Sequence, residues 1–78
     1  MKMGPGKTEL TLSEAMQVTG LSRGAVWAWA SKGYVAHRRQ GVRRDIFFDA
    51  AALRAFCAEY GYPYDADVAA RLLALHQS

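Results

Sequence analysis

The positive charge of this chain is concentrated in nine residues near its middle. Residues 37–45 contain four arginines and a single acid, whereas the rest of the chain balances six basic against six acidic side chains. The four are Arg38, Arg39, Arg43 and Arg44. A solvated surface usually mixes both signs of charge, so a concentrated basic segment is typical of a protein that binds phosphate groups. The alternative is that these arginines only decorate an exposed hairpin.

The sequence offers no recognisable arrangement for catalysis or metal binding. Ser, His and Asp are present, but not as an activated nucleophile or a carboxylate pair. His37 and His76 have no second ligand nearby, and the only cysteine, Cys57, lies in an apolar stretch and is expected to be a buried thiol. The run Gly-Pro-Gly-Lys-Thr matches only the end of a Walker-type loop, because Met1 stands where the first glycine is required. We therefore expect no enzyme activity, no cofactor, no metal and no small-molecule substrate.

Length and hydropathy narrow the class further. A chain of 78 residues that is 51% hydrophobic allows one small domain with a thin core. Its apolar runs are shorter than the roughly 20 residues needed to cross a bilayer, and its N-terminus lacks the apolar centre of a secretion signal. We expect a cytoplasmic protein without a membrane partner.

Capping signals predict a first helix that begins after Thr11. Thr11 followed three residues later by Glu14 is the pattern of a capping box, and Gly20 is expected to end the helix. One apolar face is predicted to contain Leu12, Ala15, Met16 and Thr19.

A second helix is predicted about three residues later. Ser22 can cap it, and Lys32 followed by Gly33 can close it. Two short helices joined by a tight turn with a glycine form a helix-turn-helix, in which the second helix is pushed outward into a groove. Val26 and Trp29 are predicted to face the core, which leaves Arg23, Gly24, Trp27, Ala28 and Ser31 on the outer side.

After Gly33 the pattern becomes strand-like and predicts a hairpin. Ile46 and Phe48 are expected on one face by the alternation rule, and Gly41 supplies the turn. The arginines then lie at the tip of the hairpin and on its flanks.

The C-terminal part predicts two more helices. Asp49 can cap a helix over residues 50–60 that ends at Gly61, and Asp65 or Asp67 can begin a last short helix. This last helix is expected to cover the core or to meet another protein. The expected domain organisation is thus a flexible lead-in over residues 1–9, a domain with a helix-turn-helix and a hairpin over 10–60 and a short helix within 61–78.

Residues 10–56 resemble the MerR-type winged helix-turn-helix of small phage excisionases. The matching pieces are the Leu-Thr-x-x-Glu-Ala start, the Gly-Leu-Ser-Arg turn, the Trp-x-x-x-Gly helix end, the arginine-rich wing and the Phe-Asp-x-x-x-Leu entry to the third helix. Met16 departs from the usual alanine, and Gly24 and Ala25 are small where polar residues often read bases. The resemblance implies a mainly α fold with a small β-hairpin, whereas the small residues at positions 24 and 25 predict sparse base recognition by the second helix.

The resemblance also implies a DNA-binding surface made of the second helix and the wing. Arg23 is expected to bond a guanine edge or a phosphate, and Trp27 either contacts the DNA backbone or only packs against the wing. The wing arginines are expected to neutralise phosphates and to reach the adjacent minor groove. The expected DNA-binding residues are Ser22, Arg23, Gly24, Ala25, Trp27, Lys32, Arg38, Arg39, Gln40, Arg43 and Arg44.

Three functions remain open on the sequence. The leading one is a recombination directionality factor of a phage, which binds repeated sites beside an attachment site, bends double-stranded DNA at the bacterial nucleoid and directs an integrase partner toward excision. Copies on adjacent sites would then contact one another, which compensates for the weak affinity of a single domain. The alternative is a small transcriptional regulator that uses the same surface. From a different class, a protein-interaction adaptor would use Trp27 and the last helix.

Overall fold

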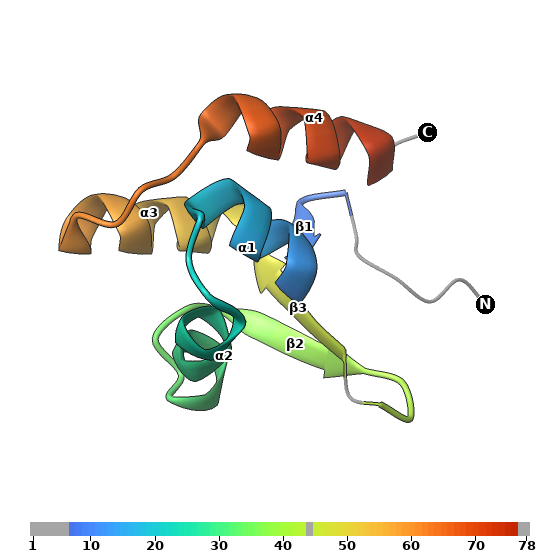
Figure 1. The fold of residues 1–78 in the computed structure, drawn as a ribbon. Helices are drawn as coiled ribbons and strands as arrows, with labels where there is room; N and C mark the ends of the chain where they lie inside the picture. The colour runs from blue at the N-terminus through green and yellow to red at the C-terminus, as the bar shows by residue number, and fades with distance from the viewer. Residues whose placement is uncertain (1–6, 44, 77–78) are drawn as a thin grey trace.

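A computed structural model describes residues 7–43 and 45–76, which form four helices and three strands (Figure 1). In chain order these are β1 (Glu9–Thr11), α1 (Leu12–Thr19), α2 (Arg23–Ser31), β2 (His37–Gln40), β3 (Asp45–Asp49), α3 (Ala50–Tyr60) and α4 (Ala66–His76). The domain is therefore a small α/β unit in which helices predominate, compatible with the expected mainly α class with a hairpin. No helix in the described ranges has the length and apolar character to span a bilayer.

The predicted caps begin the first two helices. The Thr11 hydroxyl accepts the Glu14 backbone N–H at 3.1 Å, and the Glu14 carboxylate accepts the Thr11 N–H at 2.9 Å, which completes the capping box. Gly20 ends α1 with a left-handed φ of 70°, a conformation that glycine adopts without a steric cost. Ser22 caps α2 by accepting the Ala25 N–H at 3.3 Å. The two helices are thus joined by residues 20–22, as the sequence predicts.

The sheet has one strand more than the sequence predicts. Its order is β1-β3-β2, with both pairs antiparallel. β1 includes Glu9, which falls within the predicted flexible lead-in; residues 1–6 of that lead-in lie outside the described residues. The strand forms around Leu10, which is fully buried and stands opposite Phe48. Three residues are too few to display an alternating pattern, so the sequence does not reveal this strand.

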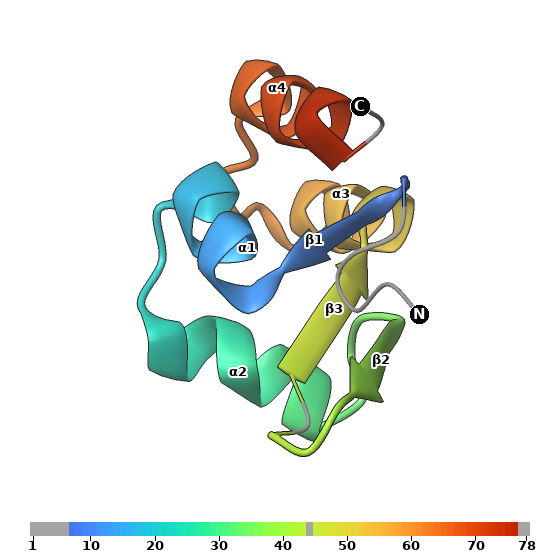
Figure 2. The ribbon, with the colours of Figure 1, turned by 90° about the vertical axis from the view of Figure 1, so that its right-hand side faces the viewer.

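Helices α1 and α3 lie between α4 and α2 (Figure 2). α4 lies over α1 and α3, and α2 lies at the opposite end of the molecule in both ribbon views. Ala69 of α4 is buried in the core, and the His76 ring nitrogen Nε2 lies 2.8 Å from a Glu14 carboxylate oxygen. The last helix therefore covers the core, which is the first of the two roles that the sequence predicts for it.

α3 begins and ends as predicted. The Asp49 carboxylate accepts the Ala52 N–H at 2.9 Å, and Gly61 ends the helix in the left-handed region. Cys57 is fully buried on its inner face, and this burial raises the pKa of the thiol. The expectation of a buried structural thiol is therefore confirmed.

Candidate nucleic-acid interface

α2 presents one polar and one buried face. Val26, Trp29 and Ala30 are buried, whereas Arg23 and Gly24 are exposed at the start of the helix. Trp27 is 47% exposed on the same outer side. Because consecutive helical residues are rotated by about 100°, positions 23 and 27 lie one turn apart on one stripe. A guanidinium and an indole therefore stand next to each other on the outer surface of the helix.

The remaining predicted residues of α2 have different surroundings. The Ser22 side chain is occupied in capping, and Ala25 is half-buried. Lys32 is exposed at the other end of the helix, where its ammonium group lies 5.9 Å from the centre of the Tyr34 ring. Along the helix axis it is about 13 Å from Arg23, at 1.5 Å per residue. Lys32 therefore belongs to the far edge of this surface.

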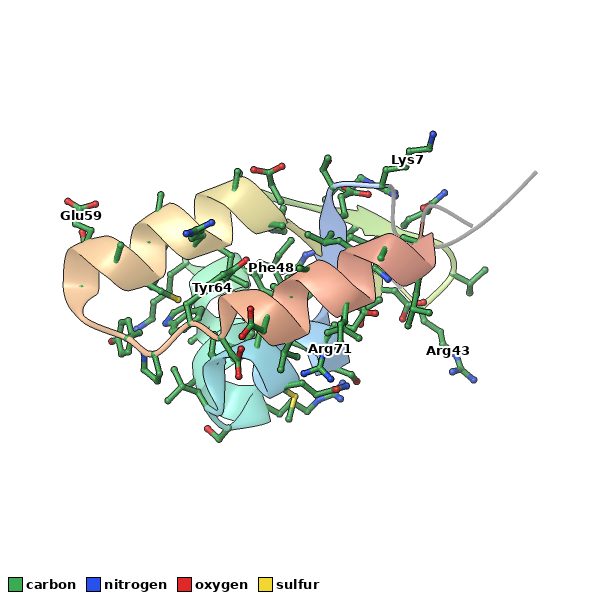
Figure 3. The ribbon with its side chains drawn as sticks, turned by 90° about the horizontal axis from the view of Figure 1, so that it is seen from above. Lys7, Arg43, Phe48, Glu59, Tyr64 and Arg71 are labelled. Atoms are coloured by element: carbon green, nitrogen blue, oxygen red, sulfur yellow. The ribbon has the colours of Figure 1, made fainter. Side chains whose placement is uncertain are left out.

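The β2–β3 hairpin carries exposed arginines toward its tip. Arg39 and Arg43 are exposed, and Val42 in the turn between them is fully exposed. Gly41 adopts a φ of 85° in this turn, and Gln40 beside it is half-buried. Arg44 lies outside the described residues. In the side-chain view Arg43 projects outward from the body of the domain (Figure 3).

Arg38 is held differently from the other arginines. Its guanidinium makes hydrogen bonds of 2.8 to 3.0 Å to both carboxylate oxygens of Glu9, and another to Gln40. It also lies 4.7 Å from the centre of the Phe47 ring. The hydrogen bond with Glu9 raises the pKa of Arg38. This arginine ties β2 to β1 across β3, which limits its freedom to reach a ligand.

A depression of about 310 Å³ brings the start of α2 together with the hairpin. Arg23 and Trp27 line it from α2, and Arg43 and Asp45 line it from the hairpin. Its other lining residues are Thr11, Leu12, Ser13, Ile46 and Phe47. Two arginines and one aspartate are among the lining residues, so the net charge of the lining is positive and favours an anion. Groups that are 20 residues apart in the sequence thus share one surface.

Several residues of this region were not predicted to belong to it from the sequence, among them Asp45, Ser13 and Glu9. Ser13 lines the depression because it follows the cap of α1, and a hydroxyl two residues after a predicted capping threonine could have indicated it. Glu9 binds Arg38, but only the pairing of β1 with β3 brings the two together. Without that strand the sequence contains no signal for the ion pair.

Trp27 faces the hairpin and still keeps almost half of its surface exposed. Both expectations for this side chain, packing against the wing and access to a ligand, are therefore compatible with its position.

No family model matches the chain, and neither the curated proteins nor the solved structures contain a significant match to it.

Proposed function

We propose that this protein binds double-stranded DNA as a winged helix-turn-helix, with α2 in the major groove and the β2–β3 hairpin as the wing. The observation that carries the proposal is the shared depression, which Arg23 and Trp27 line from α2 and Arg43 lines from the hairpin. The major groove of B-DNA admits one α-helix, and its flanking phosphates lie where a basic hairpin beside that helix would reach.

The chemistry of the exposed groups supports a nucleic acid over other anions. Arginine offers a planar fork of donors that binds either a guanine edge or a phosphate. The surface joins such forks to an indole N–H donor, and it extends from Arg23 to the hairpin tip. Gly24 has no atom near the place where a Cβ would stand, so the backbone of α2 is open to close approach. A continuous duplex matches this open surface better than a small molecule does.

The biological setting that we propose is excision of a phage genome. In this role the protein binds several sites beside an attachment site in the bacterial nucleoid, and an integrase is its partner. Control of transcription by the same surface is the alternative. The two differ in the arrangement of target sites: clustered repeats occupied stepwise support the excision role, and a single complex at a promoter supports the regulator.

The first test is DNA affinity as a function of salt, measured by gel shift or fluorescence anisotropy with competitor DNA. About four to six phosphate contacts predict a slope of log affinity on log salt near −4 to −5. Arg43→Ala is expected to weaken binding to every sequence and to reduce the slope by about 0.9, the effect of one lost phosphate contact.

Arg38→Ala is the matched control. It removes another arginine from the same hairpin, but the guanidinium of this arginine is bound to Glu9. We expect a smaller change in the salt slope than for Arg43→Ala. Binding with no dependence on salt would contradict the proposal, and equal effects of both substitutions would contradict the assignment of Arg43 to the interface.

A further inference from the structure

A cluster of aromatic rings lies between the end of α2 and the end of α3. Phe56 is at its centre, with ring centroids 4.9 Å from Trp29, 4.8 Å from Tyr60, 5.8 Å from Tyr62 and 6.2 Å from Tyr34. Trp29 is buried, but the three tyrosines are 58%, 63% and 40% exposed for Tyr34, Tyr60 and Tyr62. The core therefore continues into a surface made of aromatic rings.

Three of these rings are nearly parallel. Tyr34 lies at 17° to Phe56, and Tyr62 at 14° to it. The rings of Trp29 and Tyr60 are tilted against the central ring by 57° and 44°. Because Tyr34 and Tyr62 are nearly parallel to Phe56 and the other two rings are tilted, the aromatic surface is uneven, with shallow slots between neighbouring rings.

Two adjoining depressions, each about 310 Å³, follow from this arrangement. They share Tyr34, Phe56 and Tyr60 as walls. The first depression is lined by aromatic residues, completed by Trp29 and Tyr62. The second is completed by Glu59 and by two alanines of α3, so a carboxylate stands at one end of the pair.

We propose that these two depressions bind a proline-rich segment of a partner protein in the polyproline II conformation, with a basic residue at the Glu59 end. Such a segment repeats every three residues with a rise of about 3.1 Å per residue, so its prolines return to the same side and can occupy successive slots. Aromatic-lined grooves are the recurring receptors for this conformation.

The polar groups of the surface match the same ligand. A polyproline II segment makes no internal hydrogen bonds, so its carbonyl groups accept hydrogen bonds from a receptor. Tyrosine rings combine an apolar face with a hydroxyl donor at the edge, and three of them are exposed here. The Glu59 carboxylate would attract a lysine or arginine that flanks the prolines. A folded ligand whose backbone groups are already paired would leave these donors unused.

This surface borders the far edge of the candidate DNA interface at Lys32, whose ammonium group lies 5.9 Å from the centre of the Tyr34 ring, but it lies far from the hairpin tip. Glu59 and Arg43 lie at opposite ends of the molecule when it is viewed from above (Figure 3). A bound peptide would therefore leave the hairpin tip free, and the inference does not depend on the proposed DNA binding. A domain with both surfaces could bring a partner protein to its DNA site.

The test uses synthetic peptides and the fluorescence of Trp29. In a Trp27→Phe variant, Trp29 is the one remaining tryptophan of the chain, and it lines the first depression. The probes are peptides of nine prolines, alone or with one flanking residue. The flanking residue is an arginine or a glutamate, placed at the N-terminus or at the C-terminus. A glycine-serine peptide of equal length is the control. We expect saturable binding of an arginine peptide with a dissociation constant below about 1 mM. The glutamate peptides should bind several-fold more weakly, since one exposed charge pair changes affinity by roughly that factor.

Variants then separate the surface from the fold. Tyr60→Ala is expected to weaken peptide binding by about fivefold or more, the effect of a lost aromatic contact. Tyr60→Phe keeps the ring and should lose less. Glu59→Gln should remove the preference for arginine without changing the affinity for nine prolines alone. DNA binding by Tyr60→Ala should be unchanged, so failure of one proposal is distinguishable from failure of the other.

Four results would overturn this inference. The first is that no proline peptide binds at millimolar concentration, and the second is that Tyr60→Ala leaves peptide binding unchanged although the variant still unfolds cooperatively. The third is that the fluorescence of Trp29 responds to tetramethylammonium but not to the proline peptides. The fourth is that the protein self-associates and Tyr60→Ala abolishes this self-association. The last two would assign the surface to a quaternary ammonium ligand or to a second copy of the chain.

Discussion

Trp27 and Trp29 lie two residues apart on α2 and differ in almost every physical respect. Trp29 is 5% exposed and packs against Phe56 and Tyr62 with ring centroids about 5 Å away. Trp27 is 47% exposed and lines the depression beside Arg23 and Arg43. Two steps along a helix rotate a side chain by about 200°, so identical residues come to opposite faces. The comparison separates a side chain that stabilises the domain from one that is available to the proposed DNA ligand.

The hairpin repeats this division with two arginines. Arg38 stands opposite Phe47 on the outer face of the sheet and is bound to Glu9. Arg43 lies in the turn region, is exposed and lines the depression. Residue type alone therefore does not decide whether an arginine is bound within the fold or exposed; its position in the strand or in the turn does.

The largest effect is expected when the buried face of α2 is truncated. Trp29→Ala removes a ring that joins α2 to α3, and loss of a buried tryptophan typically costs about 3 to 5 kcal/mol in the free energy of unfolding. For a small domain this is a large fraction of the total stability. Urea unfolding followed by circular dichroism measures it.

Trp27→Ala is the matched control for that experiment. We expect it to lower the free energy of unfolding by less than about 1 kcal/mol, as is usual for a partly exposed site, and to weaken DNA binding instead. Similar losses of stability for the two substitutions would contradict the division of α2 into a core face and a binding face.

The next effect concerns Arg23 at the start of the exposed face. If its guanidinium forms a bidentate bond to a guanine edge, Arg23→Ala should reduce the discrimination between target and non-target DNA by about 1 to 3 kcal/mol. Competition titrations with the two DNAs at one salt concentration measure this difference. An equal loss of affinity for both DNAs would instead assign Arg23 to a phosphate.

Much of the fold follows from local signals in the sequence. Thr11 with Glu14, Ser22 and Asp49 predict the starts of three helices correctly, because each cap depends only on a side chain and on amides two or three residues away. β1 could not be predicted, since a strand of three residues is formed by its partner and not by its own pattern. The predicted strand from Tyr34 is also shorter in the structure, where β2 begins at His37.

Of the residues that line the candidate site, the sequence singles out Arg23, Trp27 and Arg43, but it does not predict the geometry that brings them to one depression. Charge clustering identifies the hairpin, and helical periodicity places Trp27 outside and Trp29 inside. Arg23 and Arg43 line one depression because of the way α2 packs against the hairpin, and local sequence patterns do not determine this tertiary packing. The division between Arg38 and Arg43 depends on β1 and is likewise absent from local patterns.

A smaller effect is expected at Gly24, on the exposed face of α2, where one substitution should change the stability of the fold and the affinity for DNA in opposite directions. Gly24 lies in the first turn of α2 with nothing within 4 Å of the place where a Cβ would stand. Gly24→Ala should therefore stabilise the fold by up to about 1 kcal/mol, since alanine favours the helix over glycine. If the backbone of α2 approaches DNA closely here, the same substitution weakens DNA binding.

Measurement of both quantities on one sample tests that opposition. Thermal unfolding reports the stability, and anisotropy reports the affinity. Tighter DNA binding that accompanies the gain in stability would show that no close approach occurs at Gly24.

Alkaline pH should lower the stability of the fold through Cys57 and Tyr64, and this is the smallest effect that we expect. Burial raises the pKa of the Cys57 thiol, and burial is also the main cause that raises the pKa of the Tyr64 hydroxyl. A group with a raised pKa in the folded state stabilises the fold below its unfolded pKa, and this contribution is lost as the pH rises toward the folded value. Stability should therefore fall above about pH 8.5, where unfolded thiols begin to ionise.

Urea unfolding between neutral pH and pH 10 should show a decline in stability that is shallower for Cys57→Ala, because this variant has no buried thiol to ionise. Tyr64→Phe tests the second group in the same way, with the decline beginning at higher pH because phenols ionise later than thiols. An identical pH dependence in the parent protein and in both variants would mean that the loss of stability at alkaline pH arises from groups other than Cys57 and Tyr64.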